Sequence, residues 1–217
     1  MKPPDLKEKK MAVNTVEPKT SRTSKLKKEI PKELIYEMKA GSPIYYRDYD
    51  KVLSGEKTPE EIMGSSSLQA YLLILIASYL KEKLDSSKYL VLGGEVVYKF
   101  APKSWYNLDI AVCEKEKLNE LKGTYLDIPP KVVFEIDTKA DLRKFENPQE
   151  YFHRKTQDLL DSGVEKVVWI FTKEKKLWFA EKEKPWLIVD WDYDLEILGN
   201  ITFNLSKLLN REKVKAE

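Results

Sequence analysis

The order of hydrophobic and polar positions predicts a strand, a helix and a second strand between residues 131 and 171. Residues 131–137 are rich in β-branched and aromatic side chains and alternate with a period of two, which is typical of a strand. Asn147 can cap a helix whose first turn holds Pro148, and Gly163 can end that helix. A second apolar run at residues 166–171 completes a βαβ unit.

Lys155 falls within the hydrophobic stripe of this predicted helix, between Phe152 and Leu159. An unpaired ammonium is costly to bury, so the lysine must either reach solvent or meet carboxylates. Glu135 and Asp137 share one face of the preceding strand, and a right-handed crossover lays the helix across the same sheet. We therefore expect Lys155 to meet these two acids. A lysine that extends to solvent from the edge of an ordinary amphipathic helix explains the same pattern and is the commoner case.

The rest of the pattern predicts further elements around this unit. A capping signal at Thr58 starts a short helix, and residues 67–84 are apolar on nearly all sides for three turns, as in a buried helix. Two strands are expected at residues 89–100 and 105–113, and short runs after residue 171 predict an antiparallel meander and a final helix. The expected fold class is α/β, a mixed sheet flanked by helices with an added antiparallel C-terminal meander.

Charge divides the 217-residue chain into two parts. Residues 1–32 carry ten Lys and Arg against four Asp and Glu and have few apolar side chains, which predicts a basic disordered arm. Residues 33–217 carry twenty-eight basic against thirty-two acidic side chains and can bury one core, so we expect one domain there. Strong sequence-independent DNA binding rests on neutralising phosphates, which an acidic domain does not favour. Contact with nucleic acid would need a local groove or the basic arm.

Cys113 is the only cysteine, which excludes an internal disulfide and a zinc site built from several thiolates of this chain. The longest apolar run, around residues 70–77, is too short to cross a bilayer, and no apolar segment follows Met1. We expect a soluble cytoplasmic protein with no membrane partner.

Three acids, Asp109, Glu135 and Asp137, stand in strands that otherwise have the composition of a protein core. Burial raises the pKa of a carboxyl group unless a cation or hydrogen bonds stabilise its charged form. Two or three carboxylates with waters suit Mg²⁺ or Mn²⁺ as that cation. Lys155 would then orient an attacking water or stabilise charge on a phosphate, which is the chemistry of phosphodiester hydrolysis. The alternative is a structural cluster in which Lys155 bridges Glu135 and Asp137.

The order of these residues also carries a resemblance to a known family. It rests on Asn107-Leu108-Asp109, Val133-Phe134-Glu135-Ile136-Asp137, Lys155, Gly163-Val164 and Val168-Trp169-Ile170, with weaker similarity around Tyr36-Glu37, Gly41 and the helix from Gln69. Over about residues 33–180 this order resembles the Uma-two family of endonucleases, also designated DUF820. That family belongs to the restriction-endonuclease-like superfamily, whose signature is Pro-Asp followed by Asp/Glu-X-Lys. The resemblance implies a restriction-endonuclease-like sheet and nuclease activity.

Carried over to this chain, the resemblance implies that Asp109 and Glu135 are metal-binding acids and that Lys155 is the superfamily lysine, moved from the strand to the helix. Asp137 stands where the parent signature has its lysine, and we expect it to be the third acid of the site. The expected catalytic residues are thus Asp109, Glu135, Asp137 and Lys155, with the three acids on Mg²⁺ or Mn²⁺. Leu108 replaces the proline of the signature, which shapes the backbone rather than the chemistry. Lys139 is a competing candidate for the functional lysine, because an extended strand would place it on the same face as Asp137.

Three functions remain open on these grounds. The leading hypothesis is a metal-dependent nuclease that acts on nucleic acid, with DNA as the expected polymer. The second is a catalytically inactive binding or assembly module that keeps the nuclease scaffold, as a homodimer formed through exposed sheet edges or aromatic residues. The third is a phosphohydrolase for small substrates, which the same metal chemistry permits. Saturable Mn²⁺ binding would separate the first hypothesis from the second.

Overall fold

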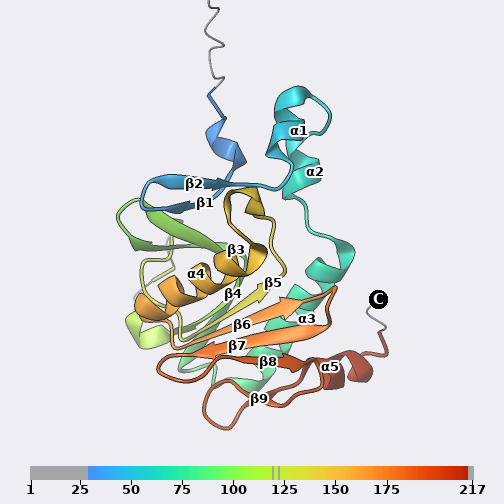
Figure 1. Ribbon diagram of the computed structural model, residues 1–217. Coiled ribbons are helices and arrows are strands. Elements are labelled where there is room, and N and C mark those ends of the chain that lie inside the picture. Colours follow the sequence, from blue (N-terminus) through green and yellow to red (C-terminus); the bar gives the residue numbers. More distant parts are fainter. Residues whose placement is uncertain (1–28, 119, 122, 215–217) are drawn as a thin grey trace, which may run out of the picture.

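A large sheet with helices on both faces organises the computed structural model, which describes residues 29–118, 120–121 and 123–214 (Figure 1). The sheet has eight strands in the order β2-β1-β4-β5-β6-β7-β8, with β3 also paired to β4. It is mixed and mostly antiparallel, which confirms the expected α/β fold class. The predicted basic arm comprises residues 1–32, and residues 1–28 of it lie outside the described residues.

The elements have the following bounds. The strands of the main sheet are β1 (Ile35–Lys39), β2 (Ser42–Tyr45), β3 (Tyr89–Ala101), β4 (Ser104–Glu114), β5 (Val132–Ile136), β6 (Lys166–Phe171), β7 (Lys176–Glu181) and β8 (Leu187–Asp190). The α-helices are α1 (Tyr49–Ser54), α2 (Pro59–Met63), α3 (Ser67–Lys83), α4 (Pro148–Asp161) and α5 (Leu205–Arg211). Single 3₁₀ turns lie at Lys32–Leu34, Lys115–Lys117 and Leu142–Lys144.

The predicted βαβ unit is confirmed, with β5 and β6 running parallel and α4 connecting them. The Asn147 side chain caps α4 by accepting a hydrogen bond from the Glu150 N–H at 3.0 Å. Beyond the C-terminal end of α4, Gly163 adopts a left-handed conformation with φ of 109°, and a Cβ there would lie 3.1 Å from Pro129. The bounds of α4 are therefore predictable from its capping residues in the sequence.

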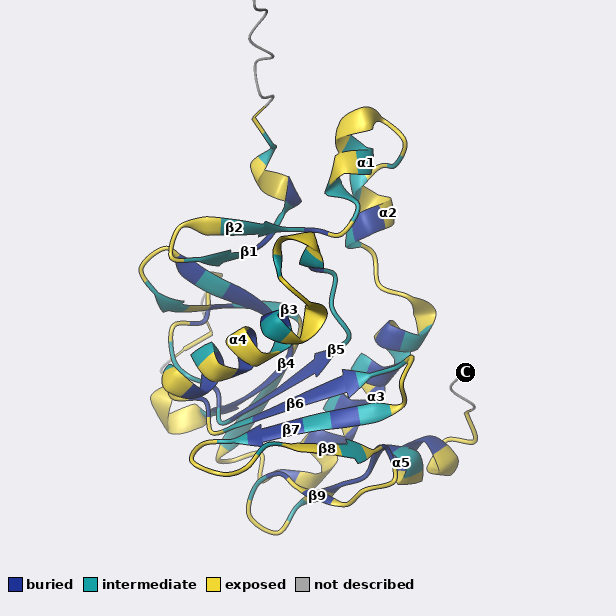
Figure 2. Ribbon diagram, viewed as in Figure 1, coloured by how far each residue is buried: buried dark blue, intermediate teal, exposed yellow. Residues whose placement is uncertain are grey.

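The core has two layers, one on each face of the sheet. Helix α3 packs on one face together with α5 and the strand residues Ile110, Phe134, Ile136, Val168 and Ile170. Helix α4 packs on the other face, with Ala111, Val133, Val167 and Trp169. Figure 2 shows the central strands buried between these helices. Side chains that point from β5 towards α4 are therefore removed from solvent.

The C-terminal meander differs from the prediction at its end. Strands β6, β7 and β8 extend the sheet as an antiparallel meander. Strands β9 (Leu195–Glu196) and β10 (Thr202–Phe203) instead form a separate two-stranded sheet. The reason is packing, because Leu195 and Phe203 are buried in the core layer of α3 rather than aligned with β8. In the described part of the chain, none of the helices has the length and apolar character needed to cross a membrane.

Candidate functional site

Lys155 on α4 is 1% exposed and lies among buried polar groups. Its Nζ donates to Glu37 Oε1 at 2.6 Å and to the carbonyl oxygen of Asn107 at 2.8 Å, and it lies 3.1 Å from Glu135 Oε2. Two of the three ammonium hydrogens are thus in hydrogen bonds, and the Glu135 carboxylate is a further ion-pair partner. The expected contact between Lys155 and Glu135 is therefore present. Glu37 on β1 takes the position that the sequence analysis gave to Asp137.

Glu37 is fully buried and is held on both oxygens. Lys155 binds Oε1, and the Tyr151 hydroxyl donates to Oε2 at 2.8 Å. The rings of Tyr106 and Trp169 each have their centroids 5.4 Å from the Lys155 ammonium, close enough for cation–π attraction. Ion pairs with two glutamates and contacts with two aromatic rings together hold the lysine in place.

Two carboxyl groups share this one ammonium, and their pKa values show the competition. Burial raises the pKa of Glu135 well above its ordinary value; the Lys155 charge opposes this, while the charges of Asp109 and Glu37 add to it. Burial also raises the pKa of Glu37 more than its bonds to Lys155 and Tyr151 lower it. For Lys155, burial lowers the pKa, but the charges of Glu135 and Glu37 outweigh it and the net shift is upward. Glu135 is therefore easier to protonate than a glutamate in water.

Asp109 on β4 lies at the C-terminal end of β5, where side chains bind both the backbone N–H and the backbone carbonyl of Ile136. Asp109 Oδ2 accepts a hydrogen bond from the Ile136 N–H at 2.7 Å, and the Gln69 side chain donates to the Ile136 carbonyl at 2.9 Å. Asp109 is 8% exposed, and burial raises its pKa despite the Ile136 bond and the charges of Lys155 and Lys139. Asp109 and Glu135 are thus two buried acids whose charges interact.

Asp137 does not join these acids as predicted. It has a positive φ of 54°, and both of its carboxylate oxygens accept hydrogen bonds from Thr172, at 2.9 Å from the backbone N–H and 2.6 Å from the hydroxyl. The period-two alternation that placed Asp137 beside Glu135 requires extended backbone, and the left-handed conformation ends it. Asp137 instead links the end of β5 to the turn that follows β6.

Among the described residues, no group of three or more His, Cys, Asp and Glu side chains is arranged to hold a metal ion. Asp137, whose carboxylate oxygens are bound by Thr172, is therefore not grouped with Asp109 and Glu135. Asp109 and Glu135 remain, and Glu135 Oε1 is buried with no hydrogen-bond partner in the described structure. Two carboxylates fit Mg²⁺ or Mn²⁺, since Mg²⁺ commonly keeps several waters and takes one or two protein carboxylates.

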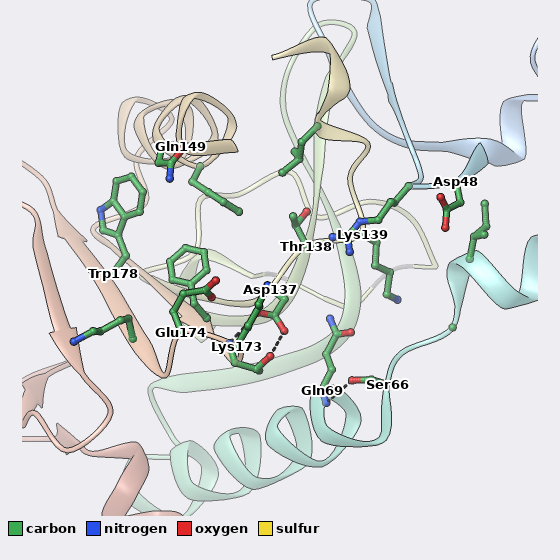
Figure 3. A pocket seen from close by; sticks show the side chains of 18 of the residues that line it. Asp48, Ser66, Gln69, Asp137, Thr138, Lys139, Gln149, Lys173, Glu174 and Trp178 are labelled. Atoms are coloured by element: carbon green, nitrogen blue, oxygen red, sulfur yellow. Dashed lines mark hydrogen bonds between the residues drawn. The ribbon is translucent and has the colours of Figure 1, made fainter. Parts of the chain in front are cut away.

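A cleft of about 690 Å³ opens beside the C-terminal end of β5 (Figure 3). Gln69, Asp137 and Lys139 line it, whereas Asp109, Glu135 and Lys155 are not among the described residues of its wall. Lys139 donates to the carbonyl of Met63 at 2.7 Å and pairs with Glu95. Gln69 and Lys139 therefore connect the cleft to the buried acids, Gln69 through the Ile136 carbonyl and Lys139 through its charge on Asp109.

Two members of this site, Glu37 and Gln69, are not among the catalytic residues expected from the sequence. Glu37 nevertheless makes the shortest contact to Lys155. Its signal was a charged residue within the apolar run Ile35 to Met38. Gln69 was noted for its place in the family pattern, and its bond to Ile136 joins residues 67 positions apart. Such pairings depend on the tertiary fold.

The chain is similar to a known protein in its fold but not in its sequence. No protein-family model matches the chain, and no curated protein matches its sequence. Among solved structures it is similar to a protein from Anabaena variabilis ATCC 29413 described as "a putative nuclease belonging to DUF820", with a TM-score of 0.50 and 13% sequence identity. The similarity covers 66% of this chain and 78% of that one. At this identity it shows the fold alone, and that fold is the mixed α/β sheet flanked by helices expected from the sequence.

Proposed function

We propose that this protein is a metal-dependent nuclease that hydrolyses phosphodiester bonds in nucleic acid, with DNA as the expected polymer. The observation that carries the proposal is the pair of buried acids, Asp109 and Glu135, beside a cleft and with Glu135 Oε1 unpartnered among the described residues. A buried polar atom without a partner costs free energy, and such atoms are often used in function. The nuclease-like fold of the chain supports the same reading.

Asp109 and Glu135 would hold the metal ion, Mg²⁺ or Mn²⁺. When bound, such an ion polarises the phosphodiester and favours ionisation of the attacking water. The Ile136 N–H fixes the Asp109 carboxylate through the 2.7 Å hydrogen bond. Lys155 fixes Glu135 Oε2 and leaves Oε1 available. Both carboxylates are therefore held in fixed orientations.

The two lysines of the site would have different tasks. The Lys155 ammonium is buried and contacts Glu37, Asn107 and Glu135, so it would act by orienting Glu135 and balancing its charge rather than by contacting water. Lys139 lines the cleft and contacts Met63 and Glu95, which leaves it one further hydrogen. Lys139 is thus placed to donate to a phosphate in the cleft.

Cleavage assays test the proposal. Purified protein would be incubated with single- and double-stranded DNA and RNA, in Mg²⁺, in Mn²⁺ and in a chelator. We expect metal-dependent cleavage that Asp109→Asn and Glu135→Gln abolish and that Glu116→Gln, at an exposed 3₁₀ turn, leaves unchanged. Cleavage that survives both substitutions in the site would contradict the assignment.

A second candidate function is a binding or assembly module that has lost catalysis. It is favoured by the burial of both acids and by the lack of a three-ligand metal group in the described chain. Homodimerisation would use a sheet edge, and the edge strand β8 carries Ile188, which is 69% exposed. This candidate function predicts that the protein binds nucleic acid or forms a homodimer, and that it cleaves no nucleic acid in the presence of any metal ion.

A further inference from the structure

One wall of the cleft is aromatic. Phe152 from α4, Phe171 from β6 and Trp178 from β7 all line the cleft and are all partly exposed. Their rings are contiguous, with centroids 5.0 Å apart for Phe152 and Phe171 and 6.5 Å apart for Phe171 and Trp178. Partly exposed rings that border a cavity offer faces on which a planar ring can stack.

The opposite side of the cleft carries cations. Figure 3 shows Trp178 and Gln149 on one side and Lys139 and Asp48 on the other. Arg47 is tied to the segment that holds Lys139, because its backbone N–H donates to the Lys139 carbonyl at 2.7 Å and its Nη2 donates to the Thr138 carbonyl at 2.6 Å. A guanidinium has five N–H donors, so one bond to a carbonyl leaves most of them for an anion.

Acidic side chains also line the cleft, and three of the four already have partners. Asp48 pairs with Lys57 at 2.6 Å, Glu61 accepts a hydrogen bond from the Thr58 N–H at 2.7 Å, and Asp137 is bound by Thr172. These bonds reduce the acids' repulsion of an anion in the cleft. A ligand with a flat ring at one end and a negative charge at the other complements both walls.

The size of the cleft limits which ligands it can hold. A volume of about 690 Å³ is that of a small-molecule site, which holds a nucleotide rather than a double helix. A base in a duplex is stacked and paired, and it reaches an aromatic wall of this kind only after leaving the helix. An unpaired base has a free face for stacking.

We propose that the cleft binds one unpaired nucleotide of a single-stranded nucleic acid, with its base against Phe171 and Trp178 and its phosphate towards Arg47 and Lys139. This inference rests on the proposed nuclease function and names the substrate class of that site. The strand would then pass the end of β5, where Gln69 and Lys139 join the cleft to the acids.

Binding measured in a chelator tests this inference apart from hydrolysis. Fluorescence anisotropy of a labelled oligonucleotide would compare a single strand with a hairpin duplex of the same composition. We expect tighter binding of the single strand, and a loss of about 5- to 150-fold for Trp178→Ala, as is common for one stacked base. Trp178→Phe should retain most of the affinity, which also guards against a folding defect in Trp178→Ala.

Matched variants and competitors complete the experiment. Arg47→Ala should weaken binding and flatten its salt dependence, whereas Lys81→Ala and Tyr193→Ala, at exposed positions outside the cleft, should change neither. Adenosine monophosphate should displace the strand only at concentrations well above those of the strand itself. Equal affinity for the free nucleotide would overturn the assignment to a strand, and so would equal affinity for the duplex.

The outcomes separate this inference from the proposed function. Metal-dependent cleavage with no effect of Trp178→Ala or Arg47→Ala on binding would overturn the inference and leave the nuclease standing. The expected binding pattern without cleavage in any metal would support the cleft assignment and overturn the nuclease.

Discussion

Lys155 and Glu37 form an ion pair that is almost completely removed from solvent, with Nζ 2.6 Å from Oε1 and the two residues 118 positions apart in the sequence. The pair joins β1 to α4 and encloses Glu135 on the same side of the sheet. Taking two charges out of water costs free energy, which the attraction between them offsets only when the geometry is good. Replacing one partner is therefore expected to be far more harmful than replacing both.

Lys155→Met should strongly destabilise the fold. The substitution keeps the length of the side chain but leaves Glu37 and Glu135 buried without their cation. Breaking a buried pair in this way typically costs about 3–5 kcal/mol. The free energy of unfolding from urea titration measures the loss. The double variant Lys155→Met/Glu37→Gln should recover part of it, and a double variant no more stable than Lys155→Met would show that the pair is not coupled.

The stability of the metal-free protein should fall as pH rises above about 4.5, the ordinary pKa of a glutamate. The pKa of Glu135 is raised by burial, so the folded state holds its proton more tightly than the unfolded chain does. The contribution of this group is complete below the ordinary pKa and is lost as pH rises through the raised value. The pKa of Lys155 is raised from 10.5, so its own contribution is lost only in alkaline solution.

Glu135→Gln isolates this effect, because glutamine is neutral at every pH. Urea titrations between pH 5 and pH 9 in a chelator should show the wild type losing stability relative to Glu135→Gln as pH rises. Mn²⁺ should restore the wild type at the upper end of that range, since a metal binds the ionised carboxylate. Parallel curves for the two proteins would show that Glu135 ionises normally.

Asp137 should prove to be a structural residue. Asp137→Ala removes two hydrogen bonds to Thr172 and places alanine in a left-handed conformation, so we expect a loss of about 1–3 kcal/mol. Asp137→Asn keeps one acceptor oxygen and tolerates that conformation, so it should lose less. Mn²⁺ affinity should be the same in Asp137→Asn as in the wild type. A large drop in affinity would restore Asp137 as a metal ligand.

Lys139 and Lys155 should respond differently to truncation. Lys139→Ala breaks part-buried contacts with Glu95 and with the Met63 carbonyl, so its cost in stability should be about 1–2 kcal/mol, less than that of Lys155→Met. The rate of nucleic-acid cleavage should nevertheless drop by about 10²–10³, the usual effect of removing one donor to a developing charge. Denaturation and steady-state cleavage rates, measured on the same preparation, make the comparison. Full activity in Lys139→Ala would exclude a contact between Lys139 and the reacting phosphate.

The extent to which sequence predicted this molecule follows from how local each signal is. The unit β5–α4–β6 was predicted because its caps and its periodicity depend on neighbours a few positions away, such as Asn147 and Glu150. The burial of Lys155 was predicted from its stripe position. Its main partner, Glu37, was not, since only the pairing of β1 with β4 brings that residue to the cluster.

The misplacement of Asp137 has a different cause. Alternation along a strand predicts side-chain direction only as far as the strand continues, and β5 ends at Ile136. The left-handed backbone of Asp137 has no clear sequence signal, because aspartate is common both in such turns and at strand ends. The separation of β9 and β10 from the main sheet also has no local sequence signal, because it depends on how Leu195 and Phe203 pack in the core.

Calorimetric titration of the metal-free protein with Mn²⁺ tests most directly whether Asp109 and Glu135 form a metal site. The proposed function predicts one saturable site in the wild type that is lost in Asp109→Asn and in Glu135→Gln, while Asp137→Asn binds as the wild type does. A wild-type protein that shows no saturable binding, or binding that both substitutions leave unchanged, would contradict it.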